Sequence, residues 1–154
     1  MRHIDWVTRA RDAIIERDET PFEWGLFDCC RGACAVWKAQ TGIDPGRKLW
    51  RYDDRRSAMR VLREEAPKGT RAKDRLMVVA TRLAAEAGMV EHEPSRAQRG
   101  FIVFAMAPVS LDPVVVEPAL GVVDLNGLNI LFPKHEGGWI VHPMSIAIRS
   151  WGVA

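Results

Sequence analysis

Residues 21–30 read PFEWGLFDCC, and the interpretation of the rest of the sequence depends on this stretch. Pro21 ends a preceding amphipathic segment, and Asp28 is a good N-cap for a helix that begins at two adjacent cysteines. A cysteine in the first turn of a helix lies near unpaired N–H groups, which stabilise thiolate over thiol. Cys29 is therefore a candidate nucleophile, on a helix that Asp28 caps.

The cysteines also have a structural interpretation. A buried cysteine ordinarily packs as a small hydrophobic side chain, and Cys30, Cys34 and Trp37 follow helical spacing, so we interpret Cys30 and Cys34 as core residues. Three cysteines on one helix do not readily form a disulfide, which fits synthesis in a reducing bacterial cytoplasm. A zinc or redox site that uses Cys29, Cys30 and Cys34 is a weaker alternative, because no second cluster completes four ligands. No metal or cofactor is expected.

Length and composition predict one globular domain over residues 1–154. The chain is 47% hydrophobic and 27% charged, and its net charge of +2 is too small to indicate nucleic-acid binding by itself. The N-terminal residues lack the apolar core of a signal peptide, and no apolar run is long enough to span a membrane. We therefore expect neither a nucleic-acid partner nor a membrane span.

Periodicity predicts helices followed by a sheet. Helices are expected at 3–17, 28–40, 55–65 and 72–87, the third with Met59 and Leu62 facing inward. Residues 91–100, EHEPSRAQRG, form a polar connector. Short apolar runs after Gly100 predict antiparallel strands, with a hairpin turn at Asn126–Gly127. The fold class is thus α+β, with a helical half at about 1–90 and a sheet half at about 100–153.

The longest of these apolar runs is VVVEPALGVV, residues 114–123. Its simplest interpretation is an interior strand of the sheet. Because it carries few charges, an edge strand that pairs with a partner is the alternative.

Four short motifs resemble the NlpC-type branch of the papain-like cysteine peptidases. They are Trp24–Gly25, Asp28–Cys29, RGFIVF at 99–104 and ALGVV at 119–123. The resemblance implies a papain-like architecture, in which a helix that begins with the nucleophilic cysteine precedes an antiparallel sheet. More narrowly, PFEWGLFDCC, TGIDPG at 41–46, ALGVV and IRSWGV at 148–153 are similar to a family of short proteins encoded in the tail-gene clusters of phages and prophages.

The sequence departs from the peptidase pattern at the general base. The position of the superfamily's histidine is occupied by Ala119, and Phe101 replaces the aspartate of its first sheet strand. His142 is the best substitute base, ahead of His135, His92 and His3. Glu117 and Asp124 border the Ala119 strand, but a carboxylate is a poor general base for a thiol near neutral pH.

Two functional hypotheses follow from this resemblance. The first is a structural component of a phage or prophage tail tip or baseplate, located in the virion tail, which binds tail hub or tail-tip proteins. The second is an NlpC-type cysteine hydrolase that cleaves the peptide of peptidoglycan, with Cys29 as nucleophile and nearby backbone N–H groups as oxyanion hole. The missing base favours the first, with Cys29 facing a cleft that contains no imidazole.

Trp24, Gly25 and Trp50 are candidate binding residues. Trp50 lies in a polar run, RKLWRYDDRR at 47–56, where an aromatic side chain serves either as a loop anchor or as an interface residue. Of these two roles, the loop anchor is the simpler.

Overall fold

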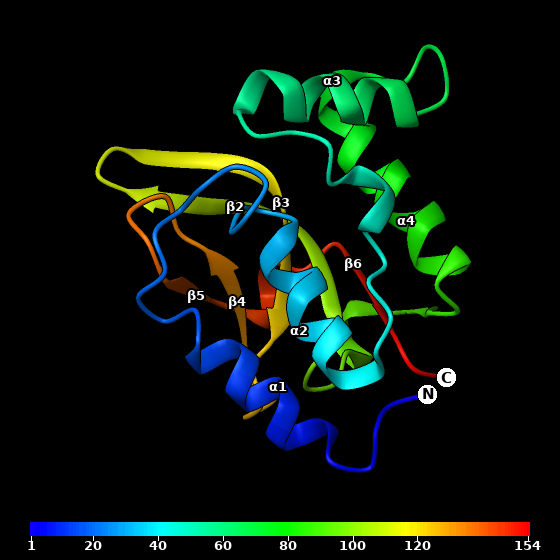
Figure 1. The fold of residues 1–154 in the computed structure, drawn as a ribbon, viewed down its shortest axis with the longest axis vertical. Helices are drawn as coiled ribbons and strands as arrows, with labels where there is room; N and C mark the ends of the chain where they lie inside the picture. The colour runs from blue at the N-terminus through cyan, green and yellow to red at the C-terminus, as the bar shows by residue number, and fades with distance from the viewer.

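The structure is a computed structural model that describes all of residues 1–154 (Figure 1). Four α-helices come first: α1 (Trp6–Ile15), α2 (Arg31–Thr41), α3 (Arg55–Glu65) and α4 (Arg75–Glu86). Six strands follow: β1 (Val90–His92), β2 (Ile102–Leu111), β3 (Val114–Val123), β4 (Asn129–Pro133), β5 (Trp139–Pro143) and β6 (Arg149–Gly152). Four 3₁₀ turns connect these elements: η1 (Arg47–Leu49), η2 (Ala72–Asp74), η3 (Pro94–Arg96) and η4 (Met144–Ile146).

The strands form one antiparallel sheet in the order β1-β6-β2-β3-β4-β5. The predicted α+β class is confirmed, but two details of its layout were wrong. The helical segments are not all N-terminal, because η3 and η4 lie between strands. The expected polar connector also contributes to the sheet, since Glu91 and His92 belong to β1, which pairs with β6. That strand has no apolar alternation of its own, and its register is set by its partner.

Helix positions follow the periodicity, with corrected ends. The third helix has the predicted bounds, whereas the first is shorter than predicted and the second begins at Arg31, after a turn at residues 28–30. The fourth begins as the 3₁₀ turn η2. Met59 was wrongly expected to face inward: it is 39% exposed, because the buried stripe of α3 runs through Ala58 and Val61.

The main core joins the helices to the sheet. Trp37 of α2 and Leu76 of α4 belong to the same buried cluster as Phe104 and Leu120 of the sheet. Figure 1 shows α2 across the centre of the molecule, with α3 at the top and α1 at the bottom. None of the helices combines the length and apolar character needed to cross a bilayer.

The two strands of the long β2–β3 hairpin differ in their outer neighbours. β3 pairs with β2 along its length, but with β4 only through Val122 and Val123. The run 114–123 is therefore an interior strand at its C-terminal end, as predicted, and leaves its N-terminal flank without a neighbouring strand. The hairpin between β3 and β4 turns at Asn126–Gly127, also as predicted, with the Gly127 N–H donating to the Asp124 carbonyl at 2.8 Å.

The turn between β4 and β5 folds over the far end of the β2–β3 hairpin. A carboxylate oxygen of Glu136 accepts hydrogen bonds from the Ser110 hydroxyl at 2.5 Å and the Leu111 N–H at 3.2 Å. Nearby, the His135 N–H donates to the Val109 carbonyl, and His142 Nε2 lies 2.7 Å from the Pro108 oxygen. The sheet therefore curls so that its β4–β5 end contacts β2.

We expect the Glu136 contact to weaken only in strong acid. The Ser110 hydrogen bond, followed by backbone N–H groups, lowers the Glu136 pKa to about 2. Since the pKa of an unfolded glutamate is about 4.3, the stabilisation is complete above that pH and is lost as pH falls toward 2. The amide NMR shift of Leu111 should therefore titrate with a midpoint well below 4.3. A midpoint at or above 4.3, or the same titration in Glu136→Gln, would contradict this.

Candidate functional site

Asp28 organises the turn before α2 with four hydrogen bonds. One carboxylate oxygen accepts the N–H groups of Cys30 and Arg31, both at 2.9 Å. The other accepts the Gly25 N–H at 2.8 Å and the Tyr52 hydroxyl at 2.7 Å. The carboxylate is fully buried, and these donors satisfy it where water cannot. Asp28 therefore has the predicted capping role, although the regular helix begins only at Arg31.

The Trp24–Gly25 loop is held against this carboxylate. Gly25 has a φ of +87°, which favours glycine, and a β-carbon there would overlap the carbonyl oxygen of Tyr52. The Trp24 ring packs edge-on to Phe22, with centroids 5.2 Å apart. Both motif residues thus have a role in closing the loop over the Asp28 turn.

Trp50 anchors its own loop. Its indole N–H donates to Asp44 at 2.7 Å, and the Arg31 guanidinium lies 4.4 Å from the centre of its ring. The loop-anchor interpretation accounts for these contacts. They leave Trp50 only half-buried, over the first turn of α2.

Cys29 lies between the Trp24–Gly25 loop and the sheet. Its carbonyl oxygen accepts a hydrogen bond from the Leu120 N–H at 2.8 Å, which places the backbone of Cys29 beside the Ala119–Leu120 segment of β3. Ala119 itself is fully buried. Cys29 is only 7% exposed and, with Trp24 and Tyr52, lines an apolar cavity of about 10 Å³. The expected open cleft at Cys29 is absent, because α3 and the Trp24 loop cover it.

No histidine forms a hydrogen bond or ion pair with Cys29. His142, the predicted substitute base, instead contacts the Pro108 oxygen, and His92 Nε2 lies 2.7 Å from the Val153 oxygen. His135 packs on Phe22, with ring centroids 4.7 Å apart, and Nε2 lies 3.7 Å from Glu117. His3 has no side-chain hydrogen bond. The structure therefore brings together Asp28, Cys29, Trp24 and Gly25, but no imidazole.

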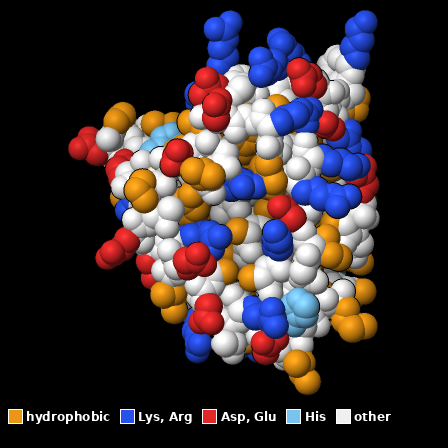
Figure 2. Space-filling model, in the orientation of Figure 1, with side chains coloured by type: hydrophobic (Ala, Val, Ile, Leu, Met, Phe, Trp, Pro, Cys, Tyr) orange, Lys and Arg blue, Asp and Glu red, His pale blue; other side chains and the backbone are white.

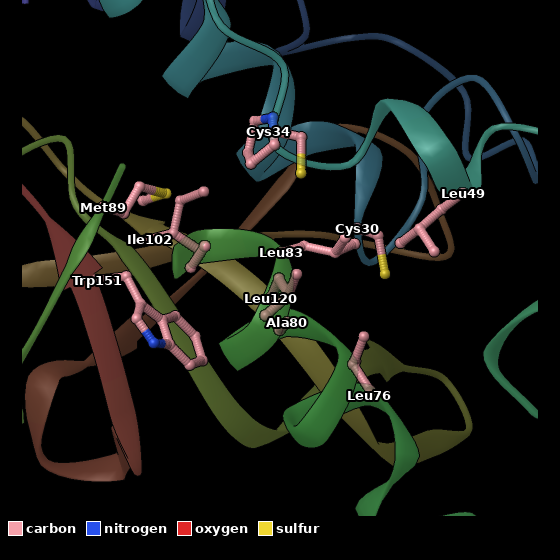
Figure 3. A pocket seen from close by; sticks show the side chains of 12 residues that line it. Cys30, Cys34, Leu49, Leu76, Ala80, Leu83, Met89, Ile102, Leu120 and Trp151 are labelled. Atoms are coloured by element: carbon pink, nitrogen blue, oxygen red, sulfur yellow. The ribbon is translucent and has the colours of Figure 1, made fainter. Parts of the chain in front are cut away.

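The other two cysteines are core residues, as predicted. Cys30 is 6% exposed and Cys34 4%. Figure 3 shows them on one side of an apolar cavity of about 30 Å³, with Trp151 of β6 on another side. A hydrogen bond with Cys29, followed by burial, raises the pKa of the Cys30 thiol well above its ordinary value. Burial also raises the pKa of Cys34, which keeps both thiols protonated at neutral pH.

We expect Cys30 and Cys34 to resist alkylation in the folded protein. Iodoacetamide at pH 7.5 should modify each of them at least about 100-fold more slowly than a free cysteine, since the thiolate is the reacting species. Guanidinium chloride at a denaturing concentration should restore ordinary rates. Peptide mass spectrometry separates the sites, and rapid labelling of Cys34 in the folded chain would contradict its placement.

Sequence reasoning missed Tyr52. Its hydroxyl donates to Asp28, and burial, followed by the neighbouring Cys30 and Asp28, raises the pKa of the phenol far above its usual range. It therefore acts as a hydrogen-bond donor at any physiological pH. The sequence offers only that it is the single tyrosine of the chain, in the polar run before α3.

One group of side chains has the spacing of metal ligands. Ligand atoms of Asp28, Cys29 and Cys30 lie within 4.8 Å of one another, whereas Cys34 is outside this group. The structure therefore does not bring Cys29, Cys30 and Cys34 together as the zinc or redox alternative requires. Both Asp28 oxygens already accept two hydrogen bonds each, so a cation would have to compete with the cap of α2.

The fold and site together define an α+β protein with a capped, buried cysteine turn at the start of its central helix. The chain belongs to the family described as "Domain of unknown function (DUF6950)", whose model matches residues 1–153. Because the match extends over both halves of the chain, the helices and the sheet belong to one family domain. Searches of curated proteins and of solved structures gave no match.

Proposed function

We propose that this protein is a structural component of a phage or prophage tail tip or baseplate, built on a papain-like scaffold that no longer performs catalysis. The tail assignment comes from the sequence motifs PFEWGLFDCC, TGIDPG, ALGVV and IRSWGV. The loss of catalysis is argued from the surroundings of Cys29. The partners on this proposal are tail hub or tail-tip proteins.

The observation that carries the proposal is the contact between Cys29 and β3. A papain-like hydrolase needs a base beside its cysteine, within about 3.2 Å of the proton that it removes. The hydrogen bond from Leu120 to Cys29 brings the neighbouring strand position to the cysteine, and that position is Ala119. A methyl group there cannot accept a proton.

Two further features count against the hydrolase alternative. The N–H groups of Cys30 and Arg31, which follow Cys29 in the chain, already donate to Asp28 and are not free to stabilise an oxyanion. The cavity at Cys29 has a volume of about 10 Å³, too small to admit a peptide substrate. Catalysis at Cys29 would require the Trp24 loop and α3 to move aside together.

The test is to find the protein in assembled particles and then to remove the Cys29 thiol by substitution. The chain, with an affinity tag, is co-expressed with the tail genes of a particle that encodes it, and purified particles are examined by mass spectrometry. We expect the chain to co-purify with tail hub or tip proteins. Cys29→Ala should leave both assembly and infection unchanged.

Two outcomes would overturn the proposal. Particles that lack the chain would refute the structural role. Assembled Cys29→Ala particles that contain a folded chain but fail to infect, together with cleavage of cell-wall fragments by the isolated wild type, would favour the hydrolase. The thermal unfolding midpoint of Cys29→Ala controls for folding.

A further inference from the structure

A groove lined by arginines lies between α3 and α4. It has a volume of about 630 Å³, and we call it the arginine groove. Its lining consists of five arginines and one methionine: Arg55, Arg56, Met59, Arg60, Arg63 and Arg75. Figure 2 shows Lys and Arg side chains gathered over the α3 and α4 region, at the top and right of the molecule. The net charge of +2 does not reveal this concentration, because the chain carries 20 acidic residues against 22 Lys and Arg.

Most of the charge in the arginine groove is unpaired. Arg55 forms an ion pair with Glu117 at 2.8 Å, and Arg60 lies 3.9 Å from Glu64. Arg56, Arg63 and Arg75 have no carboxylate within 4.0 Å.

Arginines just outside the groove are paired, by contrast. Arg82 of α4 contacts Glu65 at 2.7 Å, and Arg51 contacts the same glutamate at 3.0 Å. Glu65 therefore pairs with the arginines outside the groove, whereas Arg56, Arg63 and Arg75 inside it have no ion-pair partner.

We propose that the arginine groove binds a short acidic segment of a partner protein. A guanidinium group presents paired N–H donors that match a carboxylate, and Arg is enriched at protein interfaces for this reason. The three unpaired arginines offer such donors from two helices. Met59 adds exposed apolar surface between them, which suits a peptide that carries both carboxylate and aliphatic groups.

The shape of the charged surface favours a peptide over nucleic acid. The eleven residues of α3 span about 16 Å, and its ends carry Asp53 and Asp54 on one side and Glu64 and Glu65 on the other. These carboxylates would repel a phosphate backbone that continued past the groove. No aromatic side chain lines the groove, so bases would find no stacking surface. A segment with a few carboxylates fits within these limits.

The inference goes beyond the proposed function and does not depend on the state of Cys29. The groove-lining residues do not include Cys29 or any other residue of the Asp28 turn. Failure of the groove test would leave the particle experiment unaffected, and the reverse also holds.

The test measures binding of a fluorescent 12-residue peptide of alternating Glu and Gly. A fluorescent 12-nucleotide oligo-dT is measured in the same way, as a representative of nucleic acid. The groove variant is Arg56→Glu/Arg63→Glu. The matched control is Arg47→Glu/Arg96→Glu, since these two arginines are also exposed and without ion pairs but lie outside the groove. Both variants change the net charge equally. Thermal unfolding checks that both remain folded.

We expect the wild type to bind the peptide, with affinity falling at least about 10-fold between 50 and 300 mM salt. The groove variant should lose at least 10-fold in affinity, and the control should change less than threefold. Three results would overturn the proposal: no binding of the peptide at millimolar concentration, an equal loss in the control, or tighter binding of oligo-dT than of the peptide.

Discussion

Asp28→Ala is expected to lower the free energy of unfolding by about 3 kcal/mol or more. The substitution leaves the N–H groups of Cys30, Arg31 and Gly25 and the Tyr52 hydroxyl without their acceptor in a buried site. Each unsatisfied buried donor costs about 1–3 kcal/mol, and water that enters the vacated space recovers part of this. Urea unfolding followed by fluorescence measures the effect, since six tryptophans report on the transition.

Asp54→Ala is the matched control for that measurement. Asp54 also caps a helix, α3, but it is exposed and its side chain accepts from one backbone N–H, that of Ser57. Asp54→Ala should therefore lower the free energy of unfolding clearly less than Asp28→Ala does. Tyr52→Phe, which removes one donor to the carboxylate, should fall between the two. Equal effects of Asp28→Ala and Asp54→Ala would mean that the buried network contributes little.

Gly25→Ala is expected to destabilise the protein by about 3 kcal/mol or more. Part of this is the left-handed backbone, which costs an alanine about 1–2 kcal/mol at a φ of +87°. The rest arises because the new methyl group would overlap the Tyr52 carbonyl oxygen, which belongs to rigid backbone. The loop would have to move away from Asp28 to relieve the contact.

Gly69→Ala separates these two causes. Gly69 has a similar φ of +91°, but nothing lies within 4 Å of the position of a β-carbon there. It should show only the backbone cost, about 1–2 kcal/mol. If the two alanine variants unfold at the same urea concentration, the close approach of Tyr52 to the loop is not a constraint, and the Trp24–Gly25 motif needs another explanation.

The sequence-based predictions succeeded where short-range chemistry decides the structure. The hairpin at Asn126–Gly127 and the bounds of α3 depend on residues close in the chain, and the buried face on which Trp37 lies was predictable from helical spacing alone. The cap at Asp28 was also predictable, because aspartate before a helical segment has a known preference.

Other features depend on contacts between distant residues. β1 exists because β6 supplies its hydrogen bonds, 60 residues away, and its own sequence resembles a loop. Gln40 is fully buried because its side-chain amide donates to the Gly100 carbonyl at 2.9 Å. Neither pairing leaves a pattern within a single segment. Met59 was misplaced because it lies at the edge of the single apolar face of α3, and the packed structure centres the buried part of that face on Ala58 and Val61.

At the site, the sequence identified which residues meet, but it did not show that Cys29 is covered and buried. The motifs brought Trp24, Gly25, Asp28 and Cys29 together. The cover over Cys29 comes from Tyr52 and the residues of α3, whose packing depends on the whole helical half. The arginine groove was missed because acidic residues precede and follow its arginines in sequence, which is typical of a solvated helix face, and because Arg75 joins the lining from another helix.

The open flank of β3 has a consequence for how copies of the chain meet in concentrated solution. Along a strand, alternate amides point to the same side, so Val116, Pro118 and Leu120 share the flank that faces away from β2. Leu120 already donates to Cys29, and Pro118 has no N–H to donate. A strand from a second molecule would thus find at most one donor over residues 116–120, too few to hold a register. One proline and one internal hydrogen bond thus remove two of the three donors that residues 116–120 would offer to a second molecule.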